Sequence, residues 1–194
     1  MALFKNNRPQ LSPRDLQVRR YNTAVSSMLL IIVLTIVNIA LTIGGQDTYF
    51  LFSASIPFYL VARAAILCGF LPDAFYIETL GINPDEASFF PKSYMYKMAA
   101  IALVFVIFYV VAWLFARKGK VAWLIVALAV FTVDTISPFV FFEADFSTGV
   151  MDLVIHALVI VEFVLGIIAY FKLKDMPPEV VYTAADENTP EDQA

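Results

Sequence analysis

The stretch that decides the fold is VMDLVIHALVIVEFVLGIIAYF, residues 150–171. As a helix it is long enough to cross the roughly 30 Å hydrocarbon core of a bilayer. Three ionisable side chains interrupt it: Asp152, His156 and Glu162. Such groups are rare inside membrane spans, where they face protein or a water-filled cavity. The rest of the chain is therefore expected to supply partners for these three side chains.

The composition is that of an integral membrane protein whose main partner is the lipid bilayer. Of 194 residues, 60% are hydrophobic and only 15% are charged, too apolar for an ordinary soluble domain. The net charge of −4 gives no support for a nucleic-acid partner. Cys68 is the only cysteine, so an intrachain disulfide and a thiolate metal cage are excluded. We expect no cofactor and no metal, because no phosphate-binding, dinucleotide or calcium-loop motif occurs.

Four uncharged or weakly charged apolar runs predict transmembrane helices. They cover residues 21–45, 94–116, 121–142 and 150–171. The short linkers 117–120 and 143–149 make the last three helices antiparallel neighbours. The expected fold is an all-α integral membrane protein, a four-transmembrane-helix bundle.

The two ends of the chain are polar. Residues 1–20 form a basic N-terminal segment, in which Ser12 and Pro13 have the order of an N-cap and a first helical position. Residues 172–194 end in an acidic, low-complexity stretch that predicts a disordered tail.

The outer loop 46–93 contains a further apolar segment, 50–70, which carries Pro57 and Arg63. Four spans place ten of the thirteen Lys and Arg residues on one side of the membrane, whereas a fifth span over 50–70 would scatter them. Because the cytoplasmic loops of membrane proteins carry an excess of Lys and Arg, we expect both termini to lie in the cytoplasm. The chain is then expected to be a multi-pass protein of the plasma membrane. The segment 50–70 is then an extracytoplasmic re-entrant or interfacial helical segment between spans 1 and 2; a fifth span is the alternative.

Depth along the helices predicts which polar groups share a layer. Counting about 1.5 Å per residue from the outer end of each predicted helix places Asn38, Asp134 and His156 at similar depth. We expect the layer that they form to be open toward the outside. Glu162 lies deeper, near the level expected for Tyr109. Its face also carries Gly166 and Ala169, whose small size marks close helix contact.

These residues have structural and functional interpretations. Asn38, Asp134, His156 and Glu162 are the candidates for ligand binding or a proton relay, with Asp152, Tyr109 and Arg63 as supporting residues. The alternative is that Asp134 and His156 form a buried polar pair that fixes helix register, that Asn38 is an interhelical contact and that Arg63 is an interfacial anchor.

Three classes of function remain open. The first is a non-catalytic binding, accessory or sensor subunit acting through the outer loop and the outer-leaflet polar cluster, with a protein partner or a second copy of the chain. The second is ion- or proton-coupled transport by Asp134, His156 and Glu162. An intramembrane enzyme with His156 and Asp134 as an acid–base pair is the weakest, because no serine or cysteine stands beside a base. No catalytic residue is therefore assigned.

Overall fold

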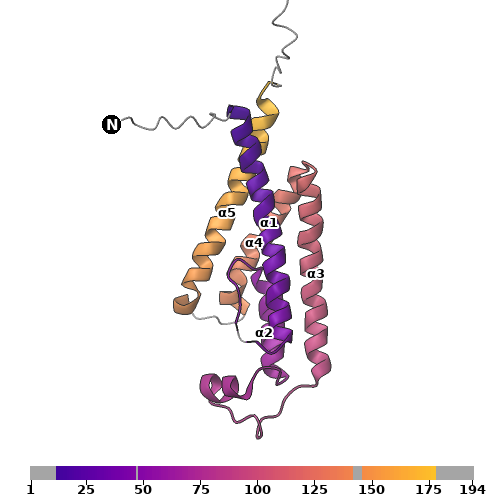
Figure 1. Cartoon of the computed structure of the whole chain (residues 1–194), viewed down its shortest axis with the longest axis vertical. Helices are drawn as coiled ribbons and strands as arrows, with labels where there is room; N and C mark the ends of the chain where they lie inside the picture. Colours follow the sequence, from indigo (N-terminus) through magenta and orange to yellow (C-terminus); the bar gives the residue numbers. More distant parts are fainter. Residues whose placement is uncertain (1–11, 47, 142–145, 178–194) are drawn as a thin grey trace, which may run out of the picture.

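The computed structural model describes residues 12–46, 48–141 and 146–177. Within these ranges the chain forms five α-helices, one short π-helical turn and no strand (Figure 1). In chain order they are α1 (Pro13–Ile43), α2 (Ser55–Leu67), η1 (Phe75–Thr79), α3 (Lys92–Arg117), α4 (Val121–Phe141) and α5 (Phe146–Asp175). The predicted basic residues 1–11, the linker residues 143–145 and the predicted disordered tail from 178 onward lie outside the described residues.

Four helices, α1, α3, α4 and α5, are long and apolar enough to cross a membrane, by length and composition. Helix α2 has 13 residues. That corresponds to about 20 Å, which is too short for a hydrocarbon core of about 30 Å. The prediction of an all-helical chain with four long apolar helices is confirmed.

Helix α1 starts where the sequence predicts. The Ser12 hydroxyl accepts a hydrogen bond from the Asp15 backbone N–H at 3.1 Å, and Pro13 occupies the first turn, where a missing N–H costs nothing. The helix ends at Ile43, with Gly44 as its C-cap. Gly45 follows with a φ of +76°, a left-handed conformation that glycine adopts without strain.

The long helices pack side by side, with α1 against α3 and α5, and α4 against α3 and α5. The start of α1, the α3–α4 turn and the end of α5 lie toward one end of the bundle, which we call the inner end (Figure 1). Tyr21 marks this end, since its hydroxyl donates to the Ala116 carbonyl at 2.6 Å and its ring lies 5.7 Å from that of Tyr170. Helix α2 and η1 lie toward the opposite, outer end.

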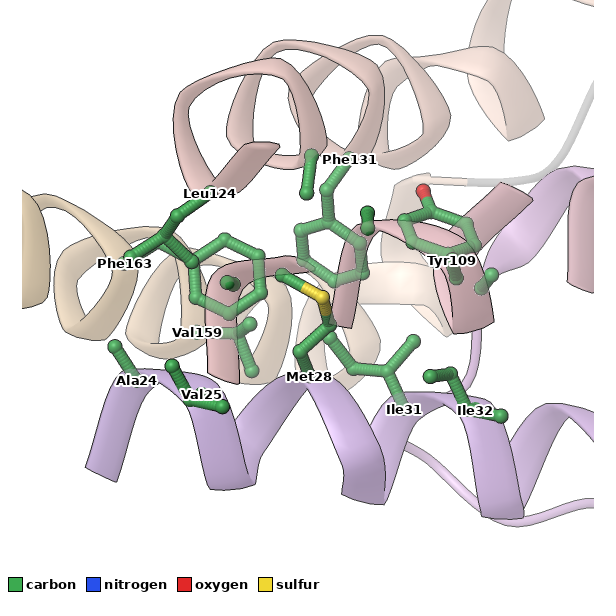
Figure 2. Packing of buried hydrophobic residues seen from close by; sticks show 14 of the residues in the cluster. Ala24, Val25, Met28, Ile31, Ile32, Tyr109, Leu124, Phe131, Val159 and Phe163 are labelled. Atoms are coloured by element: carbon green, nitrogen blue, oxygen red, sulfur yellow. The ribbon is translucent and has the colours of Figure 1, made fainter. Parts of the chain in front are cut away.

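The centre of the bundle is an apolar core between α1, α4 and α5. Met28, Ile31, Leu124, Phe131 and Phe163 are fully buried there, and Figure 2 shows Met28 and Ile31 of α1 pointing toward the rings of Phe131 and Phe163. Since each such side chain contributes about 1.5–3 kcal/mol when buried, this core holds the three helices together.

Helices α1 and α5 approach closely at a glycine. A Cβ atom added to Gly166 would lie 2.4 Å from the Ala24 Cβ, a distance that real side chains do not reach. Ala169, one turn further along α5, is also fully buried. The expected close contact on the face of Gly166 and Ala169 is therefore present, and its partner is α1.

Residues 48–67 fold back into the bundle as a hairpin, which we call the inserted hairpin. Its first limb runs along α1 toward the core and its second limb is α2, which packs against α1, α3 and α4. At the tip, the Ala54 N–H donates to the Thr35 hydroxyl at 2.8 Å. Thr35 lies two turns before the end of α1, so the tip reaches roughly 12 Å into the bundle.

Candidate functional site

Asp134 of α4 is the N-terminal cap of α2. Its two carboxylate oxygens accept hydrogen bonds from the Ser55 N–H at 2.6 Å and the Ile56 N–H at 2.7 Å. Ala54, the residue before α2, offers no side-chain cap. Asp134 is 1% exposed, and its negative charge faces the positive end of the α2 dipole. A carboxylate from another helix thus satisfies the first N–H groups of α2.

His156 of α5 binds the hairpin tip from the other side. Its Nε2 atom lies 3.0 Å from the Ser53 carbonyl oxygen and 3.3 Å from the Ser55 hydroxyl. Its Nδ1 atom lies 2.8 Å from the Asp152 carbonyl oxygen and 3.3 Å from the Asp152 carboxylate. Because a backbone carbonyl only accepts, the doubly protonated ring is the form that donates on both sides. The Asp152 carboxylate then balances its charge.

The ring of His156 also packs on an aromatic neighbour. It lies nearly parallel to Phe131, with the ring centroids 5.0 Å apart and the planes inclined by 9°. A cationic ring over an aromatic face gains electrostatic attraction in addition to packing. The same Phe131 belongs to the central core, so the polar cluster rests directly on it.

Asn38 of α1 holds the first limb of the hairpin. Its amide nitrogen donates to the Phe50 carbonyl at 2.7 Å and to the Ser53 hydroxyl at 2.9 Å, and its amide oxygen accepts from the Phe50 N–H at 2.8 Å. The side chain therefore pairs with a backbone as a neighbouring strand would. Between these contacts lies Phe52, whose φ of 71° is rare for a residue with a Cβ and costs energy that the surrounding hydrogen bonds must offset.

Three of the four principal candidates therefore meet around residues 50–56. Asn38, Asp134 and His156 converge on the hairpin backbone, and no hydrogen bond joins Asp134 to His156 among the described residues. Thr35, Ser53 and Ser55 complete the cluster without having been candidates. Their only sequence signal is polarity at apolar positions: Thr35 precedes Asn38 by one helical turn, and two serines precede Pro57 in an apolar run.

Glu162 lies apart from this cluster. Its carboxylate is hydrogen-bonded to the Ser27 hydroxyl of α1, and the side chain is only partly buried. It borders a groove of about 390 Å³ between α1 and α5 that opens toward the inner end. The other residues lining this groove are Leu16, Arg19, Arg20, Thr23 and Leu165.

Tyr109, expected at the level of Glu162, is placed on the other side of the core. Figure 2 shows Phe163, the neighbour of Glu162, and Tyr109 at opposite sides of the view, with Met28 and Phe131 between them. Tyr109 is fully buried and lies near Asp134, and its hydroxyl has no hydrogen-bond partner in the described part of the chain.

The remaining candidates, Asp152 and Arg63, lie nearer the outer end. Asp152 is 21% exposed and close to two phenols of the hairpin. Burial raises the pKa of Tyr49 and Tyr59, and the negative charge of Asp152 raises the pKa of both further. Arg63 lines a pocket of about 310 Å³ between α2 and the end of α1, together with Thr42, Gln46, Thr48, Tyr49, Phe58, Tyr59, Ala62, Ile66, Leu71 and Phe75.

The polar side chains of Asn38, Asp134 and His156 hold the inserted hairpin in the bundle, and we call these three side chains the latch. Its carboxylate, imidazole and amide groups are occupied by backbone and hydroxyl partners of the inserted hairpin. No group of three His, Cys, Asp or Glu side chains within the described ranges is placed to hold a metal ion.

Comparison with known proteins adds no family to this description. No protein-family model, no curated protein and no solved structure matches the chain.

Proposed function

We propose that the chain is a multi-pass protein of the plasma membrane, with α1, α3, α4 and α5 as its spans and both termini in the cytoplasm. Basic residues support this orientation. Arg14, Arg19, Arg20, Arg117, Lys118, Lys120, Lys172 and Lys174 are all in the parts of the helices or turns nearest the inner end, and Lys5 and Arg8 precede α1 in the sequence. Arg63, Lys92 and Lys97 are the other three. Such an excess is typical of the cytoplasmic side.

In this orientation the inserted hairpin is a re-entrant segment. It would enter the outer leaflet and leave it on the same side, because α2 is too short to cross. Non-helical backbone is tolerated at membrane depth only where protein surrounds it and satisfies its polar groups. The bonds from Asn38, Thr35 and Asp134 to residues 50–56 supply such partners for part of this backbone.

We infer that the protein acts as a non-catalytic binding or accessory subunit, which presents its outer lobe, residues 70–91, to a protein partner. This proposal rests on the exposed apolar side chains of the lobe. Ile77 is 56% exposed and Phe90 is 51% exposed, and Leu80 and Ile82 are also exposed. Exposed apolar side chains on a lobe with polar residues are typical of an interaction surface. The charges of the lobe are Asp73, Glu78, Asp85 and Glu86, all exposed acids, so the partner surface is expected to be apolar with basic residues.

The inserted hairpin would serve this role by fixing the outer lobe. Tyr76 of η1 is buried, and its hydroxyl donates to the Ile66 carbonyl at the end of α2 at 3.0 Å. The Phe90 N–H donates to the Leu67 carbonyl at 2.8 Å. The lobe is thus attached to α2, and α2 is attached to the bundle through Asp134.

A photo-crosslinking amino acid at Ile77 tests the proposal in native membranes. We expect one discrete protein adduct, reduced when Glu78 and Glu86 are both changed to Lys. The matched control is Val133 of α4, which is 61% exposed but lies on an apolar helix face and should give lipid adducts. Lipid adducts alone at both positions would contradict a protein partner for the outer lobe.

Transport is the second candidate. It is favoured by the Tyr109 hydroxyl, which lies near Asp134 and has no hydrogen-bond partner within the described ranges, and by the groove that reaches Glu162 from the inner end. Against it, Met28, Phe131, Val159 and Phe163 form an apolar layer between Glu162 and the polar cluster. A proton path would have to cross this layer. Proteoliposomes holding the wild type or Glu162→Gln discriminate: equal, background proton flux is expected, whereas a flux abolished by Glu162→Gln would establish transport.

A further inference from the structure

Helix α1 differs from the other long helices on its outward face. Over residues 98–116, 121–141 and 150–171 the exposed side chains of α3, α4 and α5 are all apolar, whereas α1 exposes Asn22, Thr23 and Ser26. These follow Tyr21, which is level with the end of α3, so they lie in the inner part of the span. Such polar groups are the usual contacts between helices in membranes.

Two of these side chains have no partner in the described structure. The Thr23 hydroxyl donates to the Arg19 carbonyl of its own helix at 3.0 Å. The side chains of Asn22 and Ser26 make no hydrogen bond to any other described residue. Facing lipid, the Asn22 amide would leave two donors and an acceptor without partners, an unfavourable state that contact with another polar helix removes.

Part of the exposed surface of α1 follows a heptad. Steps of four and three residues connect eight exposed positions, which we call the α1 stripe: Asp15, Arg19, Asn22, Ser26, Leu29, Val33, Ile36 and Ala40. Spacing of this kind keeps one side of a helix facing a partner helix along its whole length. Leu29 and Val33 fall at the d and a positions of the repeat, a combination that favours two-stranded pairing.

The α1 stripe is a ridge between two hollows. On one side a hollow of about 500 Å³ is lined by Asp15, Arg19, Asn22, Ser26 and further residues of α1. On the other side a hollow of about 390 Å³ lies between α1 and α3, bordered by Asn22, Ser26, Trp113 and Arg117. Ridges of one helix pack into the grooves of another, so the α1 stripe and the hollows beside it can pack against a helical partner.

We propose that the α1 stripe is the interface of a parallel homodimer. Two copies inserted in the same orientation can pair their α1 helices only in parallel, around a two-fold axis along the bilayer normal. Each residue then faces its own copy or a position one turn away. Asn22 and Ser26 each carry both donor and acceptor groups, so each can bond to itself across the axis.

Disulfide crosslinking in native membranes tests the pairing. In a Cys68→Ser background, Ser26→Cys and Val33→Cys are expected to give covalent dimers on oxidation. Leu158→Cys of α5 and Leu103→Cys of α3 are the matched controls, since Leu158 is 57%, Leu103 54% and Val33 47% exposed, and should stay monomeric. Equal crosslinking at all four positions would indicate random collision and overturn the proposal.

A second measurement uses the purified full-length chain in mild detergent, by sedimentation. The double variant Asn22→Leu, Ser26→Leu is expected to weaken dimerisation about tenfold, from the loss of a few intramembrane polar contacts. Val104→Leu is the control and should leave it unchanged. A monomer at every concentration, or an adduct of Ser26→Cys with a different protein only, would refute self-association. The inference rests on the proposed membrane placement: recovery outside the membrane fraction would refute that placement, whereas membrane-bound monomers would refute only the dimer.

Discussion

Asp134 accepts hydrogen bonds from the first two N–H groups of α2, at the tip of the inserted hairpin. A helix that begins inside a bundle exposes N–H groups that water cannot reach, and a buried donor without a partner costs about 1–3 kcal/mol. The carboxylate of Asp134 supplies both required acceptors at 2.6 and 2.7 Å. Its negative charge also interacts favourably with the positive end of the α2 dipole, whereas a neutral side chain would interact with it only weakly.

Replacing Asp134 by Asn should therefore destabilise the protein by about 1–3 kcal/mol, because an amide offers one acceptor where two are used. Reversible unfolding in mixed detergent, followed by far-UV circular dichroism, measures this loss. Glu86→Gln, an exposed acid of the outer lobe, should remain within about 0.5 kcal/mol of wild type. If Asp134→Asn lost no more stability than this control, the carboxylate of Asp134 would not be what holds the start of α2.

Asp134 and His156 should also be energetically coupled, although they bind opposite sides of the hairpin tip. Both contact Ser55, one through its N–H and the other through its hydroxyl. We expect the losses of unfolding free energy caused by Asp134→Asn and His156→Gln to be non-additive by about 0.5–3 kcal/mol. Either change loosens the tip, and a loosened tip also loses its contact with the other residue. The same unfolding measurement on the double variant gives the coupling, and strict additivity would mean that the tip does not connect the two residues.

At the level of elements, the contact between α1 and α5 is set by small side chains. Ala24 and Gly166 face each other where no further Cβ atom fits. Above and below this point, the contacts of Tyr21 with Tyr170 and of Ser27 with Glu162 join the same two helices. A bulkier residue at the crossing would therefore separate both pairs.

Gly166→Ala should accordingly destabilise the bundle by about 1–3 kcal/mol, since overpacking forces the backbones apart. Adding Ala24→Gly to the same chain should restore most of this stability, because the missing Cβ is merely moved to the other helix. Thermal unfolding of the two single variants and the double variant measures the exchange. If Ala24→Gly fails to rescue, the close contact does not limit the approach of α1 and α5.

The sequence predicts the long helices better than it predicts the hairpin. Length and apolar composition suffice for four helices, and depth counting brings Asn38, Asp134 and His156 to one level. Their partners were not predictable, because the groups they bind are mostly backbone N–H and C=O groups, which have no sequence signature. The start of α2 was equally hidden, since Asp134 caps it from another helix and Ala54 gives no local signal. For Glu162, helical spacing gave a direction but could not identify Ser27 as its neighbour.

At the scale of the whole molecule, polarity is divided between the two ends. The outer end holds the hairpin with its latch and the acidic lobe, and the inner end carries most of the basic residues. The apolar layer of Met28, Phe131 and Phe163 separates them. The proposed binding role would use the outer end of the molecule. It requires the inserted hairpin to return to the side from which it entered.

Cysteine accessibility tests that return most directly. Single cysteines at Gln46 and Asp73, in a Cys68→Ser background, flank the inserted hairpin on its two sides in the sequence, and both positions are exposed. In intact cells, both should react with an impermeant thiol reagent, whereas a cysteine at Lys118 should react only after the membrane is opened. Reaction of Gln46→Cys without Asp73→Cys would show that the segment crosses the membrane and would contradict the re-entrant hairpin.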